Sequence, residues 1–173
     1  VKVGTKNALR ILEHAGRNNI HVYKGESTPL KRELLTAEWV HGTDGLGGVP
    51  FPAPSKTEEG QDAVTFLKDA ITNSEEKVTL CVLGPMTNIG KAILEMPEIV
   101  ENIEQIVFMG GSATGGNTTP AAEFNILVDP DATHIVLHSG VKLVMMGLDV
   151  THQAISTSNR IKMVRNNAIP SKI

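Results

Sequence analysis

An acid, an aromatic ring and an amide stand in direct succession at Glu123, Phe124 and Asn125. A carboxylate accepts hydrogen bonds from two hydroxyl groups, and an asparagine amide both donates and accepts, so this set suits a polyhydroxylated ligand. If the segment is extended, Glu123 and Asn125 point to the same side. The alternative is that the acid and the amide cap the helix that follows.

The residues before this set form a glycine-rich segment, MGGSATGGN, which ends at Asn117. Glycines after a strand suggest a dinucleotide or phosphate site, but the spacing does not give G-x-G-x-x-G and no phosphate-loop lysine follows. The glycines more simply let the backbone pass close to a ligand or to another strand. Asn117 either binds a polar ligand or is an ordinary turn residue.

Two groups of histidines are further candidates. His41 opens the segment HGTDGLGG, within a long irregular stretch at 24–57. Such stretches are uncommon in compact domains unless they line a site, so His41 is either a proton or hydrogen-bond donor on a site-covering loop or a solvated loop residue. His134 and His138 have the i, i+4 spacing of a metal pair, but without an H-E-x-x-H pattern an exposed helix face is the better interpretation.

Alternating strand and helix patterns must position these residues. Nearly continuous apolar runs predict strands covered on both faces, as in a parallel sheet, and Cys81 in one of them is expected to be a small buried hydrophobe. The predicted strands are His21–Tyr23, Val78–Leu83, Gln105–Met109 and Lys142–Leu148. The predicted helices are Thr5–Ala15 with Thr5 as N-cap, Glu58–Asn73, Thr87–Leu94 and Asp129–Ser139 with Asp129-Pro130 as its start. The pattern predicts an open, mostly parallel α/β sheet with flanking helices.

Ligands of open α/β sheets bind at the carboxyl ends of the strands. Three polar segments follow predicted strands: LGPMTN, GGSATGGNTTPAAEFN and DVTHQ. We therefore expect the site to be built from these segments. Asp149 and His152 of the third are either functional or part of a turn and cap.

Composition limits the class of protein. The 173 residues, 40% hydrophobic and 20% charged, are expected to form a single α/β domain over 1–173. A net charge of −3 argues against nucleic acid or an anionic membrane as partner, and no segment reaches the ~20 apolar residues of a membrane span. One cysteine cannot form an internal disulfide, which fits a reducing compartment such as the cytoplasm.

Four blocks together resemble the inosine-uridine nucleoside hydrolase family. They are HGTDGLGG, LGPMTNIGKAI, IVFMGGSATGGNTTPAAEFNILVDPDA and MMGLDVTHQA, in that order and at similar spacing across about residues 5–160. The resemblance implies an open α/β fold and hydrolysis of the N-glycosidic bond of ribonucleosides to ribose and free base. It also implies a bound Ca²⁺, a homodimer or homotetramer, and a role in purine or pyrimidine salvage.

The resemblance also implies roles for individual residues. Asn117, Glu123 and Asn125 look like the ligands of the ribose hydroxyls, with Phe124 packing beside the sugar. Leu83 looks like the position whose main-chain carbonyl coordinates calcium, and His41 matches a loop histidine near the base. Developing oxocarbenium character on the ribose would require a tight grip on its hydroxyls, and a protonated or hydrogen-bonded base leaves more easily.

The sequence departs from the family at both ends. The Asp-x-Asp-x-x-x-Asp-Asp run that supplies calcium ligands and the general base is not present, nor is the later His-Asp pair. We expect these residues upstream of Val1 and beyond Ile173, so that the fold is incomplete at both ends. The 173 residues alone are then expected neither to hold Ca²⁺ tightly nor to turn over nucleosides. The alternative is a non-catalytic relative that binds a ribose-like ligand or a protein partner.

Overall fold

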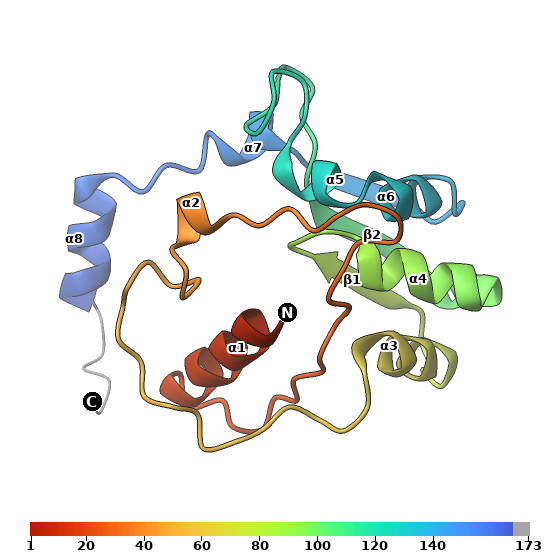
Figure 1. The fold of residues 1–173 in the computed structure, drawn as a ribbon, viewed down its shortest axis with the longest axis horizontal. Helices are drawn as coiled ribbons and strands as arrows, with labels where there is room; N and C mark the ends of the chain where they lie inside the picture. Colours follow the sequence, from red (N-terminus) through yellow and green to blue (C-terminus); the bar gives the residue numbers. More distant parts are fainter. Residues whose placement is uncertain (168–173) are drawn as a thin grey trace.

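A three-stranded parallel sheet forms the centre of the chain. The computed structural model describes residues 1–167. The strands β1 (Val78–Val82), β2 (Ile103–Met109) and β3 (Leu143–Met146) lie in the order β1-β2-β3 (Figure 1). Val82 pairs with Phe108, and Phe108 pairs with Met145, so the carboxyl ends of all three strands meet at one edge. The predicted open α/β fold with a parallel sheet is confirmed.

Helices connect the strands and cover one face of the sheet. Ile106 and Phe108 of β2 are buried in one core with Ile93 of the helix before them and with Ala132 and Val136 of the helix after them. The helical elements are α1 (Lys2–His14), α2 (Glu38–His41), α3 (Ala63–Thr72), α4 (Thr87–Glu95), the 3₁₀ helix η1 (Pro97–Asn102), α5 (Phe124–Val128), α6 (Pro130–Leu137), α7 (Leu148–Thr151) and α8 (Ser158–Asn167).

Two aspartates begin helices as N-caps. Asp129 accepts the backbone N–H of Ala132 and precedes Pro130, which confirms the predicted start of α6. Asp62 caps α3, which begins five residues after the predicted Glu58. Thr5 was expected to cap α1, but that expectation is wrong: the helix begins at Lys2, and the Thr5 hydroxyl donates back to the carbonyl of Val1 at 3.1 Å.

One face of the sheet is exposed in the described residues, although the sequence predicted strands covered on both faces. Cys81 is exposed, not buried, because side chains alternate along β1: Val82 points into the helix-covered core, whereas Thr79 and Cys81 point to the opposite face. Among the described residues that opposite face is not packed against helices, since Met146 of β3 is also exposed. A continuous apolar run therefore did not imply cover on both faces.

The predicted strand at His21–Tyr23 is not formed. The segment is irregular and makes a single parallel bridge nearby, between Lys24 and Asp62. The ring of Tyr23 stacks on Phe66 of α3 with centroids 3.7 Å apart and an interplanar angle of 11°. The apolar and aromatic residues here thus pack a connecting segment against a helix, which a three-residue pattern does not distinguish from a strand.

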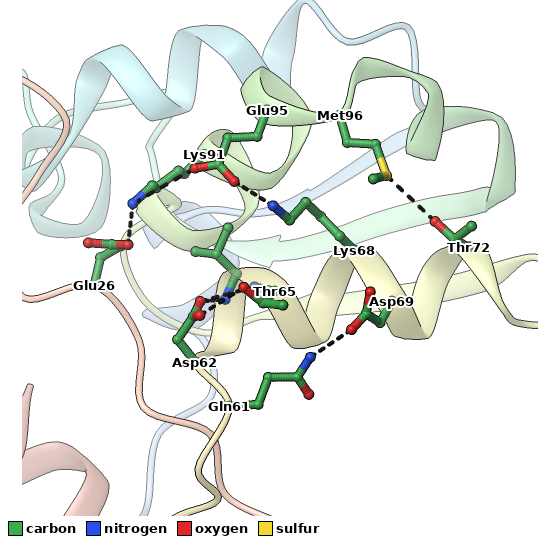
Figure 2. Close-up of polar contacts among 11 residues, drawn as sticks. Glu26, Gln61, Asp62, Thr65, Lys68, Asp69, Thr72, Lys91, Glu95 and Met96 are labelled. Atoms are coloured by element: carbon green, nitrogen blue, oxygen red, sulfur yellow. Dashed lines mark hydrogen bonds and ion pairs between the residues drawn. The ribbon is translucent and has the colours of Figure 1, made fainter.

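One ion pair fixes the irregular segment against α4, and a second joins α3 to α4 (Figure 2). Lys91 of α4 binds Glu26 at 2.6 Å, and Lys68 of α3 binds Glu95 of α4 at 2.5 Å. The hydrogen bond from Lys91 to the Glu26 carboxylate raises the pKa of the lysine. The Asn88 side chain also accepts the backbone N–H of Glu26 at 2.8 Å. These contacts set the path by which residues 24–30 reach the sheet edge.

The first helix lies apart from the sheet and packs on the second half of the irregular segment (Figure 1). The Asn7 side chain donates to the carbonyl of Asp44 at 2.7 Å, and Glu13 accepts the N–H of Ser55 at 2.8 Å. Through residue 167, no helix has both the length and the apolar character that a membrane crossing requires.

Candidate functional site

Glu123 lies at the carboxyl end of β2 and caps a short helix. It immediately precedes α5, and its side chain is only 3% exposed. Its Oε2 accepts the N–H of Ile126 at 3.2 Å and the N–H of Gly111 at 3.0 Å. The capping role considered from sequence is therefore confirmed. Its Oε1 has no hydrogen-bond partner among residues 1–167.

The two asparagines are anchored beside it. Asn125 donates from Nδ2 to the carbonyl of Met109, the last residue of β2, at 3.1 Å. Asn117 accepts the N–H of Phe124 on its Oδ1 at 2.9 Å and the hydroxyl of Thr118 at 3.1 Å. In the described part of the chain, Asn125 Oδ1 and Asn117 Nδ2 have no protein partner. Two acceptors, counting Glu123 Oε1, and one donor are thus left for a ligand.

The backbone at Phe124 and Asn125 does not have the extended conformation that the sequence argument assumed. Phe124 and Asn125 are the first residues of α5, so the segment is not extended, and the argument that Glu123 and Asn125 share a side of a strand does not apply. The structure still brings the four predicted residues together, because Asn117 in the loop accepts the N–H of Phe124, directly after the loop. The four are Asn117, Glu123, Phe124 and Asn125. Phe124 is half-buried at this turn.

The glycines of the loop serve its own packing. A Cβ atom on Gly116 would lie 2.2 Å from the carbonyl oxygen of Thr119 and 2.3 Å from that of Ala122. Gly111 has a φ of +71°, a conformation that favours glycine. The close backbone approach expected of these residues is therefore seen within the loop itself.

The segment after β1 reaches the same edge of the sheet. Leu83 follows Val82, which pairs with Phe108, and Met109, whose carbonyl accepts the amide of Asn125, follows Phe108. The side chain of Leu83 is 82% exposed. Three predicted strand-end segments thus meet at one edge.

A buried carboxylate joins these segments, and sequence analysis identified it only as a cap. Asp129 is fully buried, and its Oδ2 accepts the Thr87 hydroxyl at 2.7 Å and the N–H of Leu30 at 2.9 Å. Its Oδ1 accepts the N–H of Ala132 at 3.0 Å. One side chain therefore holds α6, the start of α4 and the irregular segment together.

His41 is not brought to this edge. It ends α2 with an exposed side chain, and within residues 1–167 no hydrogen bond joins its loop to the Glu123 segment. The loop is instead wound around Asp44, whose carboxylate accepts the N–H groups of Leu46 and Gly48. These bonds lower the pKa of Asp44 below its ordinary value.

The histidine pair lies on an exposed helix face, as predicted. The rings of His134 and His138 are 4.0 Å apart, and His138 Nδ1 lies 2.9 Å from the His134 carbonyl oxygen. No third ligating side chain completes a metal site here or elsewhere in the described residues.

Calcium does not fit the described residues by themselves. The ion takes 6–8 oxygen ligands, with carboxylates among them. At this edge the carboxylate of Glu123 is committed through one oxygen to Gly111, and that of Asp149 accepts the N–H of Ala113 at 3.2 Å. One carbonyl at Leu83 and scattered amides fall short of a calcium shell.

Comparison with known proteins shows the family to which the chain is similar. The sequence profile described as inosine-uridine preferring nucleoside hydrolase matches residues 1–172. The chain is 48% identical to the pyrimidine-specific ribonucleoside hydrolase RihA of Shewanella sp. (strain MR-7), over 97% of this chain and 52% of that protein. It is 45% identical to an uncharacterised protein of Schizosaccharomyces pombe, over 100% of this chain and 56% of the relative.

A solved structure shows the same fold. The purine-preferring ribonucleoside hydrolase from Gardnerella vaginalis superposes with a TM-score of 0.90 at 35% identity, over 95% of this chain and 54% of that one. The chain spans about half the length of the curated relatives it matches. Because the profile match covers nearly every residue, the chain belongs to the inosine-uridine preferring nucleoside hydrolase family.

Proposed function

We propose that this chain serves the hydrolysis of the N-glycosidic bond of ribonucleosides, giving ribose and free base. The profile match over residues 1–172 carries the proposal. It is supported by relatives named as ribonucleoside hydrolases, one pyrimidine-specific at 48% identity and one purine-preferring at 35%.

The residues at the sheet edge would bind the sugar. A ribose hydroxyl can donate to Glu123 Oε1 or to Asn125 Oδ1, and Asn117 Nδ2 can donate to a hydroxyl oxygen. Each of these side chains is held by backbone on its other polar atom, so little rotamer freedom remains to be lost when a ligand binds. Phe124 would pack beside the sugar.

Two roles depend on residues outside this group. We propose that the Leu83 main-chain carbonyl contributes to a Ca²⁺ site, and that carboxylates other than those described here complete it. We propose that His41 donates a proton or hydrogen bond to the leaving base once its loop lies over the site. The chain by itself would hold Ca²⁺ weakly, and titration calorimetry of residues 1–173 should show no micromolar binding.

The remaining properties are proposed on the same basis. The substrate partner is a ribonucleoside, the setting is cytoplasmic nucleoside salvage, and the assembly is a homodimer or homotetramer.

The test uses the complete product of the reading frame that encodes this sequence. Release of base from uridine, cytidine and inosine is followed, and at least one should be cleaved. Glu123→Gln should lower kcat/KM by about 10- to 100-fold, because one side-chain oxygen becomes an NH₂ and either the backbone or the hydroxyl loses its acceptor. Glu101→Gln on an exposed position is the matched control and should change little.

Two results would decide against this reading. Absence of cleavage of all three nucleosides, with ribose still bound, would favour a non-catalytic sugar-binding relative. An unchanged kcat/KM in Glu123→Gln would remove Glu123 from the sugar site.

A further inference from the structure

The loop 110–123, which carries Asn117, is held to the rest of the chain at its base. Two of the bonds are internal: Gly111 N–H donates to Glu123, and Asn117 accepts from Phe124. The loop rises above the sheet next to α7 (Figure 1). Bonds to other elements add a restraint on the part of the loop beyond its base.

Two such bonds run between the loop and the residues after β3. Leu148 donates its N–H to the carbonyl of Gly111 at 3.0 Å. In the opposite direction, Ala113 donates its N–H to Asp149 Oδ1 at 3.2 Å. Within residues 1–167, Asp149 is the one side chain from outside 109–125 that hydrogen-bonds to this loop.

The backbone around Asp149 is built for this contact. A Cβ atom on Gly147 would lie 2.9 Å from Asp149 Oδ1 and 3.0 Å from the carbonyl oxygen of Gly111. Only glycine leaves room for the loop to approach this closely. Leu148 is 5% exposed, which anchors the start of α7 in the protein.

The carboxylate is not used for capping its own helix. No side-chain bond caps α7, and Asp149 accepts no N–H from α7 among the described residues. The turn-and-cap interpretation considered from sequence therefore does not account for Asp149. Its one observed bond reaches across to the loop, four residues before Asn117.

We infer that Asp149 is a positioning residue that holds the rising limb of the loop 110–123, and thereby Asn117, in place to meet a ribose hydroxyl. The role of Asn117 rests on the proposed function, whereas the restraint on the loop does not. Asp149 touches no substrate in this scheme. It acts through Ala113 and the four residues that follow.

The restraint on the loop is tested first, by amide hydrogen exchange of the complete gene product. In Asp149→Ala the amides of residues 112–119 should exchange about fivefold to tenfold faster, because a hydrogen bond to a charged acceptor is lost. Asp149→Asn keeps an oxygen acceptor and should stay within about twofold of the wild type. Gln153→Ala is the matched control, since Gln153 lies just beyond α7 and its removal breaks a side-chain bond to the Asp149 carbonyl without touching the loop. Unchanged exchange in Asp149→Ala would overturn the inference.

The consequence for binding is tested in the complete gene product. Asp149→Ala should raise KM for the cleaved nucleoside about tenfold with kcat within about threefold, and Asp149→Asn should restore KM. A merely structural role would lower the yield of folded protein and leave KM unchanged, which would contradict the inference. If the wild type cleaves no nucleoside, the proposed function fails, and the exchange experiment alone decides on Asp149.

Discussion

The substitution Gly90→Ala, which adds one methyl group, tests the packing of the two helices behind the site. Gly90 lies in α4, two residues after the strand-end segment LGPMTN, and faces Ala132 of α6. A Cβ atom built there would lie 2.8 Å from both Cα and Cβ of Ala132 and 2.9 Å from its carbonyl oxygen. Ordinary carbon–carbon contacts are ~3.5–4.0 Å, so the two helices would have to separate by about 1 Å.

The magnitude follows from two opposing terms. Alanine gains about 1 kcal/mol over glycine in a helix interior. Overpacking a close contact costs about 1–3 kcal/mol and sometimes more, and here two of the three clashing atoms are backbone atoms that no rotamer change can move. Because backbone atoms must move, we take the upper end of the overpacking cost, about 3 kcal/mol, and subtract the gain of about 1 kcal/mol, so Gly90→Ala should lower the free energy of unfolding by about 2 kcal/mol.

The assay is equilibrium urea denaturation followed by circular dichroism, with the slope compared between variants. Gly4→Ala in α1 is the matched control, because its Cβ atom would meet nothing within 4 Å, and it should be neutral or stabilising by about 0.5 kcal/mol. The double variant G90A/A132G removes one of the three contacts and should remain less stable than the wild type. Equal or greater stability of Gly90→Ala at an unchanged slope would refute the reasoning.

Two further predictions concern side chains that fix the site segments. Thr87→Val removes the hydroxyl that Asp129 accepts at 2.7 Å in a buried setting and should cost about 1–2 kcal/mol in urea denaturation, whereas Thr87→Ser should cost clearly less; equal stabilities would contradict it. The pKa of Asp62 is lowered by the N–H and hydroxyl of Thr65, so its contribution to stability is present above the ordinary value of 3.8 and is lost as pH falls through the lower folded-state value. Asp62→Asn should therefore lose less stability than the wild type between about pH 5 and about pH 2, and parallel acid profiles would exclude this role.

The elements that sequence identified are those with long apolar patterns and chemically distinct ends. Three strands and the helices α3, α4 and α6 formed where they were expected, although α3 begins five residues later and β3 ends two residues earlier than predicted. The pair Asp129-Pro130 located a helix start to the residue. The predicted strand His21–Tyr23 failed because three residues give too little pattern to separate a strand from a packed loop.

The contacts between elements were beyond a single sequence. The exposure of Cys81 depends on which face of the sheet the helices cover, and an apolar run does not encode that choice. The bond from Ala113 to Asp149 joins residues 36 positions apart, and neither residue has a local signal that names the other. The nearest indication in the sequence is a long polar loop together with a glycine, Gly147, directly before the helix that contacts it.

Capping and ligand binding were weighed for Glu123 as alternatives, but the structure makes them compatible. A carboxylate has two oxygens, and the helix start and Gly111 together occupy only Oε2. Holding one oxygen fixes the other in space, so the cap orients Oε1 before any ligand arrives. The same division holds for Asn125, whose NH₂ group is bound by Met109 while its oxygen is left. Because fixed groups lose little entropy on binding, the bonds that look purely structural are the ones that would make a sugar site effective.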